Sequence, residues 1–171
     1  MKDRAGKFKG AVFEIRSVIE EFSMQCIGGM MAAKILLERA LLPSLLAGSC
    51  NWTGIRKHTE EACDELIYLF WRCMFKVPES TPKIGLIAET STIRTKWRIW
   101  LQKMMLVKRI QNMDMSVLAR QVYEKQLKLR LPGLAREVTD ICDKISIPVI
   151  NFVEVKKEKI EEHIFFKGRL Y

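Results

Sequence analysis

Apolar residues recur at spacings of three and four along most of this chain, and this periodicity restricts the fold more than any other feature of the sequence. The first segment shows it, because Val12, Ile15, Ile19 and Phe22 would line one side of a helix. No segment alternates apolar and polar residues for long enough to predict a sheet, and only 147–155 could form one short strand. The sequence therefore predicts an all-α fold, an irregular bundle of about six helices with no substantial sheet.

Glycine, proline and turn residues divide the periodic pattern into separate helices. The predicted helices cover 12–26, 30–42, 59–75, 93–112, 116–129 and 134–145. Pro43 is compatible either with the first turn of a continuing helix or with a kink.

A domain organisation in four parts follows from this division and from the charge pattern. We expect 1–8 to be a disordered or accidental start, 9–91 a first helical part, 92–150 a basic helical part, and 151–171 a charged tail that forms a frayed or truncated helix.

The positive charge of the chain is concentrated in one stretch. The formal net charge is +9, and residues 92–131 hold 10 basic and 2 acidic residues, which gives this stretch a charge of +8 (10 − 2). A local excess of this kind favours an anionic partner, nucleic acid first and a membrane surface second. The alternative interpretation is a solvated surface helix.

The helix predicted over 93–112 separates its apolar residues from its basic ones. At about 100° per residue, Trp97, Trp100 and Met104 fall on one side, which favours core packing of the tryptophans over stacking on bases. The guanidinium group of arginine suits phosphate through its planar fork. The residues predicted to contact nucleic-acid phosphates are Arg94, Arg98, Lys103, Lys108 and Arg109. The next helix is predicted to expose Arg120, Lys125, Lys128 and Arg130.

No group of residues in the sequence has the pattern of an active site. The chain has no glycine-rich phosphate loop, no metalloprotease motif and only two histidines. The neighbouring carboxylates Glu60, Glu61, Asp64 and Glu65 are interpreted as solvated residues that compensate a helix dipole. The five cysteines include no Cys-x-x-Cys pair and are interpreted as inert apolar residues. We therefore expect no enzyme activity of its own, no metal and no cofactor.

The sequence also bears on where the chain is found. No apolar stretch approaches the length of about 18 residues that a membrane span needs, and the first residues lack the apolar run of a secretory signal. We expect an intracellular protein, cytoplasmic or nuclear and not secreted, with no membrane partner.

Several short blocks follow one another in an order that is typical of one protein family. The blocks are 42–48, 70–72, 77–83, 88–90, 96–100, 106–110 and 132–148. In this order they resemble the reverse transcriptase of LINE-like, non-LTR retrotransposons. The part resembled is the thumb and the helical region that follows the catalytic palm, and the resemblance covers Lys9 to Phe166.

The resemblance implies a piece of an RNA-directed DNA polymerase without its catalytic centre. Family members carry an aromatic-x-Asp-Asp motif in the palm, and this sequence has no Asp-Asp pair. We therefore expect a truncated, non-catalytic remnant that retains non-specific binding to the RNA or DNA backbone. In the intact enzymes the thumb holds the template–primer duplex with basic side chains, a role that Arg94 to Arg109 would keep here. The alternative is a helical protein-interaction or structural domain with no nucleic-acid role.

Overall fold

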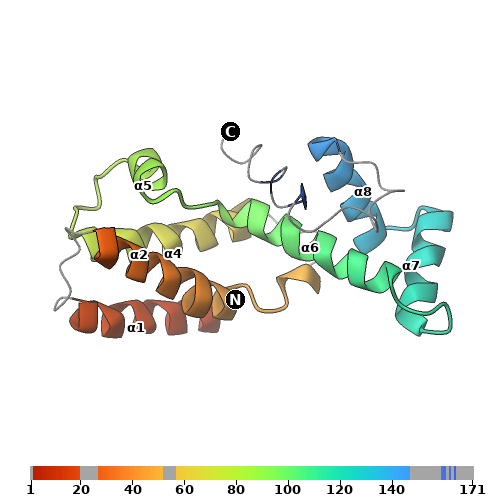
Figure 1. Ribbon diagram of the computed structural model, residues 1–171, viewed down its shortest axis with the longest axis horizontal. Coiled ribbons are helices and arrows are strands. Elements are labelled where there is room, and N and C mark those ends of the chain that lie inside the picture. The colour runs from red at the N-terminus through yellow and green to blue at the C-terminus, as the bar shows by residue number, and fades with distance from the viewer. Residues whose placement is uncertain are drawn as a thin grey trace. The chain divides into compact units, whose positions relative to one another are not determined.

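The computed structural model describes residues 2–19, 27–51, 57–146 and four residues of the tail, 159, 160, 162 and 164. Every element in this part of the chain is helical, which confirms the all-α prediction (Figure 1). The chain divides into two compact units. Unit 1 comprises Met1–Ala47 and Arg56–Thr95, and unit 2 comprises Gly48–Ile55 and Lys96–Tyr171. The boundary between Thr95 and Lys96 lies four residues after the predicted boundary between 91 and 92. The grouping of Gly48–Ile55 with unit 2 was not predicted.

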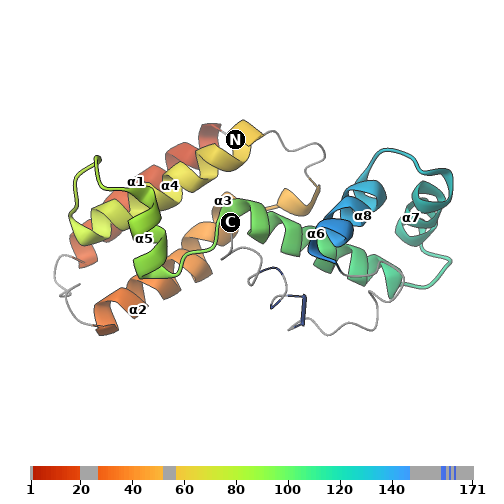
Figure 2. The ribbon, with the colours of Figure 1, turned by 90° about the horizontal axis from the view of Figure 1, so that it is seen from above.

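Unit 1 is built on helices that pack along α4. Its elements are α1 (Lys2–Ile19), α2 (Ile27–Leu36), the π-helix η1 (Leu37–Leu41), α3 (Leu42–Leu45), α4 (Lys57–Phe75) and α5 (Lys83–Thr90). Helix α1 packs against α4 and α3, and α1 and α4 lie side by side in both views (Figures 1 and 2). Phe70 and Trp71 of α4 are fully buried in this core together with Leu37 and Leu45.

The first residues of the chain belong to α1, so the prediction of a disordered start over 1–8 is wrong. Phe8 is 2% exposed and lies one turn before the buried Val12. Both side chains therefore point to the same side of α1, and burial of Phe8 extends the helix toward its beginning. The flanking charged residues concealed this position in the sequence pattern.

The second helix passes through Pro43 because it widens just before this residue. The Leu42 N–H donates to the Leu37 carbonyl, the five-residue spacing of a π turn. In a regular α-helix the proline ring would clash with the carbonyl four residues earlier. The wider turn accommodates the ring, and α3 continues to Leu45.

Helix α5 is an additional helix that the sequence pattern did not predict. It begins after Pro82 and ends at Ser91, whose φ of 48° is left-handed. Only Leu86 and Thr90 are buried, too few positions to give a visible period. The segment after α5 is tied to α4, because the Trp71 indole N–H donates to Thr92 Oγ1 at 2.8 Å in a buried hydrogen bond.

Unit 2 contains the basic stretch of the chain. Its elements are the 3₁₀-helix η2 (Ser49–Asn51), α6 (Thr95–Gln111), α7 (Leu118–Leu129) and α8 (Leu134–Ile145), with Thr95 itself grouped in unit 1. Helix α7 packs against α8, whose buried side consists of Ala135, Val138, Ile141, Cys142 and Ile145. The predicted ranges 93–112, 116–129 and 134–145 are confirmed to within two residues.

The predictions for the end of the chain fall mostly outside the described residues. The possible strand at 147–155 lies entirely there. Of the charged tail, Lys159, Ile160, Glu162 and Ile164 are helical, and the two isoleucines are buried.

Candidate nucleic-acid interface

Helix α6 has a buried side and an opposite side that carries charge. Ile99, Met104 and Val107 are almost completely buried, and Trp97 is buried with them. The core-packing prediction for the apolar side of this helix is therefore confirmed for these residues. Burial of that side determines which of the basic residues of α6 remain at the surface.

Lys103 lies on the buried side of α6, so its prediction as a phosphate-binding residue is wrong. Its side chain is 5% exposed, and its ammonium group pairs with the carboxylate of Glu137 on α8. Helical spacing explains this, because Lys103 falls one turn from both Ile99 and Val107 and about 140° from Arg98. The charge of Lys103 is therefore used inside unit 2 and is not presented to a ligand.

The other four predicted residues keep contact with the surface. Arg94 is exposed and lies in unit 1, directly before the first residue of α6. In unit 2, Arg109 is exposed, and Arg98 and Lys108 are half-buried. We call Arg98, Lys108 and Arg109 the α6 ridge. Arg98 and Arg109 lie on the side of α6 away from its buried residues, and Lys108 lies at the margin of that side, about 40° from the buried Met104. The ridge extends over about 16 Å of the helix axis, enough to follow several consecutive phosphates of a strand.

Helix α7 contributes further cations to unit 2. Lys125, Lys128 and Arg130 are exposed, as predicted. Arg120 differs from the prediction, since it is half-buried and pairs with Glu124 at 2.6 Å, one turn further along α7. The Arg120 side chain is thus only 18% exposed, whereas the other three cations lie at the surface of unit 2.

Trp100 has two cationic neighbours that sequence reasoning did not identify. Its ring meets that of Trp97 edge to face, with centroids 5.0 Å apart. The ammonium group of Lys96 lies 4.8 Å from the Trp100 ring centroid, and that of Lys144 lies 5.6 Å away. These are cation–π distances, so Trp100 already has partners within its own unit. The four-residue spacing of Lys96 and Trp100 was the sequence signal for one of these contacts.

The carboxylates of α4 hold other parts of unit 1 in place. Asp64 Oδ1 accepts a hydrogen bond at 2.8 Å from the N–H of Thr95, the first residue of α6. Asp64 therefore satisfies a backbone N–H within unit 1, at the residue where α6 begins. Glu65 pairs with Lys83 at the beginning of α5. Both carboxylates therefore have partners that the sequence pattern did not predict, although the Glu65 side chain is 51% exposed and remains solvated as predicted.

The buried cysteines have the properties of inert thiols. Burial raises the pKa of the Cys63 thiol to about 11, and Asp64 and Glu60 add to the rise. Burial likewise raises the pKa of Cys142 to about 11, with a contribution from Asp143. Thiols of this kind stay protonated at neutral pH and are poor nucleophiles. Within the described ranges, no three metal-ligating side chains lie close enough together to hold an ion.

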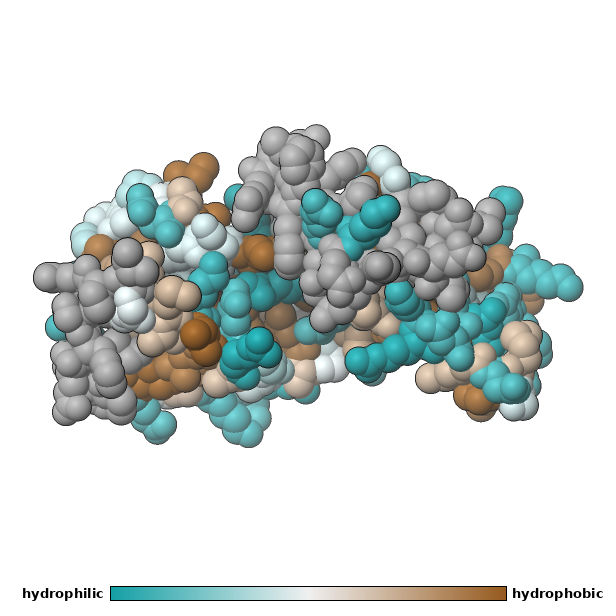
Figure 3. Space-filling view, viewed as in Figure 1, coloured by the Kyte–Doolittle hydropathy of each residue, from teal (hydrophilic) through white to brown (hydrophobic). Residues whose placement is uncertain are grey.

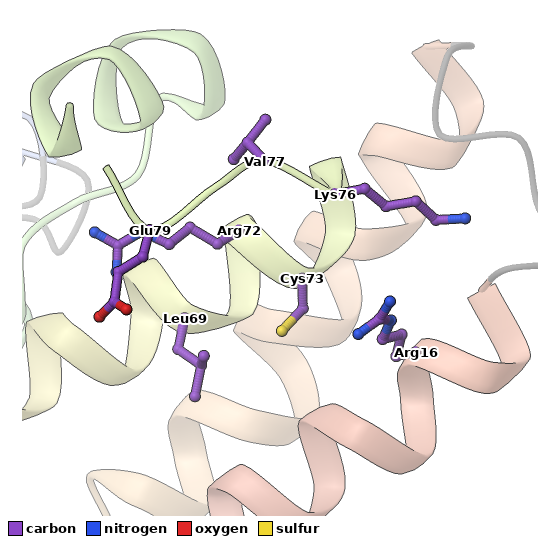
Figure 4. Close-up of a pocket in the computed structure, with 7 residues that line it drawn as sticks. All are labelled: Arg16, Leu69, Arg72, Cys73, Lys76, Val77 and Glu79. Carbon is purple, nitrogen blue, oxygen red and sulfur yellow. The ribbon is translucent and has the colours of Figure 1, made fainter. Parts of the chain in front are cut away.

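A pocket of about 400 Å³ in unit 1 contains three basic side chains, Arg16, Arg72 and Lys76 (Figure 4). Figure 4 shows that these cations do not converge. Arg16 points toward Cys73, Arg72 points the opposite way on the side of Glu79, and Lys76 extends outward. An anion in this pocket would meet the three charges separately, so the α6 ridge is the better candidate for phosphate binding.

Comparison with known proteins adds no functional information to the geometry of these residues. No protein family model, no curated protein and no solved structure matches the chain. The relation to reverse transcriptases thus stays a prediction from the sequence blocks. Across the residues that the structure describes, no helix combines the length and apolar character that crossing a bilayer requires.

Proposed function

We propose that this chain is a non-catalytic helical module, related to the reverse transcriptase of non-LTR retrotransposons, that binds the RNA or DNA backbone without sequence preference. The observation that carries this proposal is the α6 ridge. Arg98 and Arg109 lie opposite the buried side of α6, and Lys108 lies at the margin of that exposed side, so the helix can approach a duplex without exposing its core. Arginine and lysine on such a surface contact phosphates, and the release of counterions supplies the affinity.

Two further observations support backbone binding over base recognition. Trp97 is buried and Trp100 already has aromatic and ammonium partners, which disfavours stacking on bases. The exposed cations of α7 add positive charge to the same unit and strengthen long-range attraction. The missing Asp-Asp motif supports a module that binds without polymerising.

The salt dependence of binding tests the ridge directly. We expect weak binding of a fluorescein-labelled duplex in anisotropy titrations, with a Kd of about 10⁻⁴ to 10⁻⁶ M at physiological salt. Three phosphate contacts contribute about −2.7 to the slope of log K against log salt, since each contributes about −0.9 on B-form DNA. The triple variant Arg98→Gln/Lys108→Gln/Arg109→Gln should lose this contribution, while Arg109→Gln alone should lose about one third of it.

A variant with the same loss of charge in unit 1 serves as the matched control. Lys7→Gln/Lys9→Gln/Arg39→Gln removes three exposed cations of α1 and η1 and should leave most of the slope intact. Circular dichroism should show the same helix content for all variants, because glutamine is a good helix former. If both triple variants reduce the slope equally, the proposal is wrong and the protein-interaction alternative is favoured. The same conclusion follows if neither Arg109→Gln nor the ridge triple variant changes the slope.

A further inference from the structure

Helix α7 and the loop before it carry an exposed apolar surface in unit 2. Seven large apolar side chains between Met113 and Leu131 are at least 40% exposed. They are Met113, Met115, Val117, Leu118, Val122, Leu129 and Leu131. In Figure 3, hydrophobic (brown and tan) atoms lie next to hydrophilic (teal) atoms where Figure 1, in the same view, shows α7. Exposed apolar residues that gather in one place mark a site of interaction more often than scattered ones do.

The exposed apolar residues of α7 form a stripe on one side of the helix. Leu118, Val122 and Leu129 are separated by four and seven residues, which places them within about 40° of one another. Leu118 is 72% exposed and Leu129 is 62% exposed. Tyr123, on a different side of α7, is buried. The stripe is therefore not the side that holds α7 in its own unit.

Positive charge accompanies the stripe. Lys125 lies between Val122 and Leu129 on the same side of α7, and Lys128 and Arg130 are exposed nearby. The two carboxylates of the same segment are already engaged. Glu124 pairs with Arg120, and Asp114 accepts a hydrogen bond at 2.8 Å from the Ser116 N–H.

We propose that this surface, the α7 face (Leu118, Val122, Lys125 and Leu129), binds an acidic amphipathic helix of a partner protein. A stripe with helical spacing accepts the apolar side of another helix, whose residues repeat at the same spacing. Carboxylates beside that apolar side would pair with Lys125 and Lys128. The charge of the α7 face thus selects an acidic partner.

The same charges disfavour two other occupants. A second copy of the chain would bring like charges together, which opposes self-association through this face. A bilayer would have to accept Lys125 within the inserted stripe, where an ammonium group is costly without a counter-charge. An acidic helix supplies that counter-charge and covers the leucines at the same time.

Calorimetric titration of the full chain with three synthetic helical peptides tests this proposal. The peptides share one stripe of leucines and carry glutamate, glutamine or lysine beside it. The glutamate peptide should bind at least about tenfold more tightly than the glutamine peptide, and the lysine peptide should bind least. Leu118→Gln/Leu129→Gln should weaken the glutamate peptide at least about tenfold.

Two variants serve as controls, and both should bind the glutamate peptide as the unsubstituted chain does. Ile84→Gln changes an isoleucine of α5 that is 75% exposed, outside the α7 face. Arg98→Gln/Lys108→Gln/Arg109→Gln removes the α6 ridge, so a loss of peptide binding there would overturn the proposal.

Other results would also overturn it. Equal binding of the three peptides, or no effect of Leu118→Gln/Leu129→Gln, would show that the α7 face does not recognise an acidic helix. If the chain dimerises in sedimentation experiments and Leu118→Gln/Leu129→Gln abolishes the dimer, the α7 face binds a second copy of the chain. If the chain sediments with phosphatidylserine vesicles and the same double substitution abolishes this, the α7 face binds lipid.

Discussion

Replacing Glu137 with glutamine should destabilise unit 2 by about 3 kcal/mol, because it leaves the ammonium group of Lys103 buried without its counter-charge. The Lys103 side chain is 5% exposed, and the Glu137 side chain with which it pairs is 26% exposed. Removing one partner of a buried ion pair costs about 3–5 kcal/mol. We expect the lower end of this range, since the partly exposed carboxylate already retains some contact with water.

The reverse substitution should cost much less. Lys103→Met removes the buried charge and keeps an unbranched chain among apolar residues, while Glu137 can turn toward solvent. We expect a loss of about 1 kcal/mol for this variant and a similar loss for the double variant Lys103→Met/Glu137→Gln. The double-mutant cycle should then give a coupling of about 3 kcal/mol.

Urea unfolding measures these differences. Tryptophan fluorescence reports on Trp52, Trp97 and Trp100 in unit 2 and on Trp71 in unit 1, and circular dichroism reports on all helices. With a slope of about 2 kcal/mol/M, Glu137→Gln should lower the midpoint for unit 2 by about 1.5 M. If Glu137→Gln and Lys103→Met lower the midpoint equally, the Lys103 ammonium group reaches water and the burial argument fails.

Three further predictions concern buried groups. Trp71→Phe should cost about 1–2 kcal/mol, because Thr92 loses the indole N–H that donates to it at 2.8 Å, and an unchanged urea midpoint would contradict this. Cys63 and Cys142 should resist thiol reagents in the folded chain at neutral pH, and labelling as fast as in urea would refute their burial. Because folding raises the pKa of each thiol from 9.0 to about 11, the unfolded chain loses these protons first as the pH rises. Their contribution to the free energy of unfolding is therefore complete below about pH 9 and falls between about pH 9 and 11. The loss is up to about 1.4 kcal/mol per pH unit for each thiol, and urea midpoints at several pH values would measure it.

The sequence pattern was sufficient where one side of a helix is continuously buried. Helix α8 has five buried positions at helical spacing, and its range was predicted to within two residues. The same holds for α6, whose apolar side could be identified from spacing alone. In both helices, burial repeats with the helical period, so the information lies in neighbouring residues.

The pattern failed where few residues of a helix are buried. Helix α5 buries Leu86 and Thr90 and has no visible period. At the beginning of α1 the buried residue is Phe8, among charged neighbours. In these places the helix forms because another element covers a few of its side chains. That element lies elsewhere in the chain, so the local sequence pattern does not reveal the contact.

The candidate interface shows the same division between local pattern and tertiary contact. The sequence by itself determined that α6 is basic and that Arg98 and Arg109 fall on one side of it, since helical spacing alone decides both. Spacing also places Lys103 between Ile99 and Val107, but residue type alone does not distinguish it from a phosphate-binding lysine. Only the tertiary structure decided its role, because the carboxylate that neutralises it comes from Glu137 on α8. A buried ammonium group needs a partner, and packing of distant elements determines which side chain supplies it.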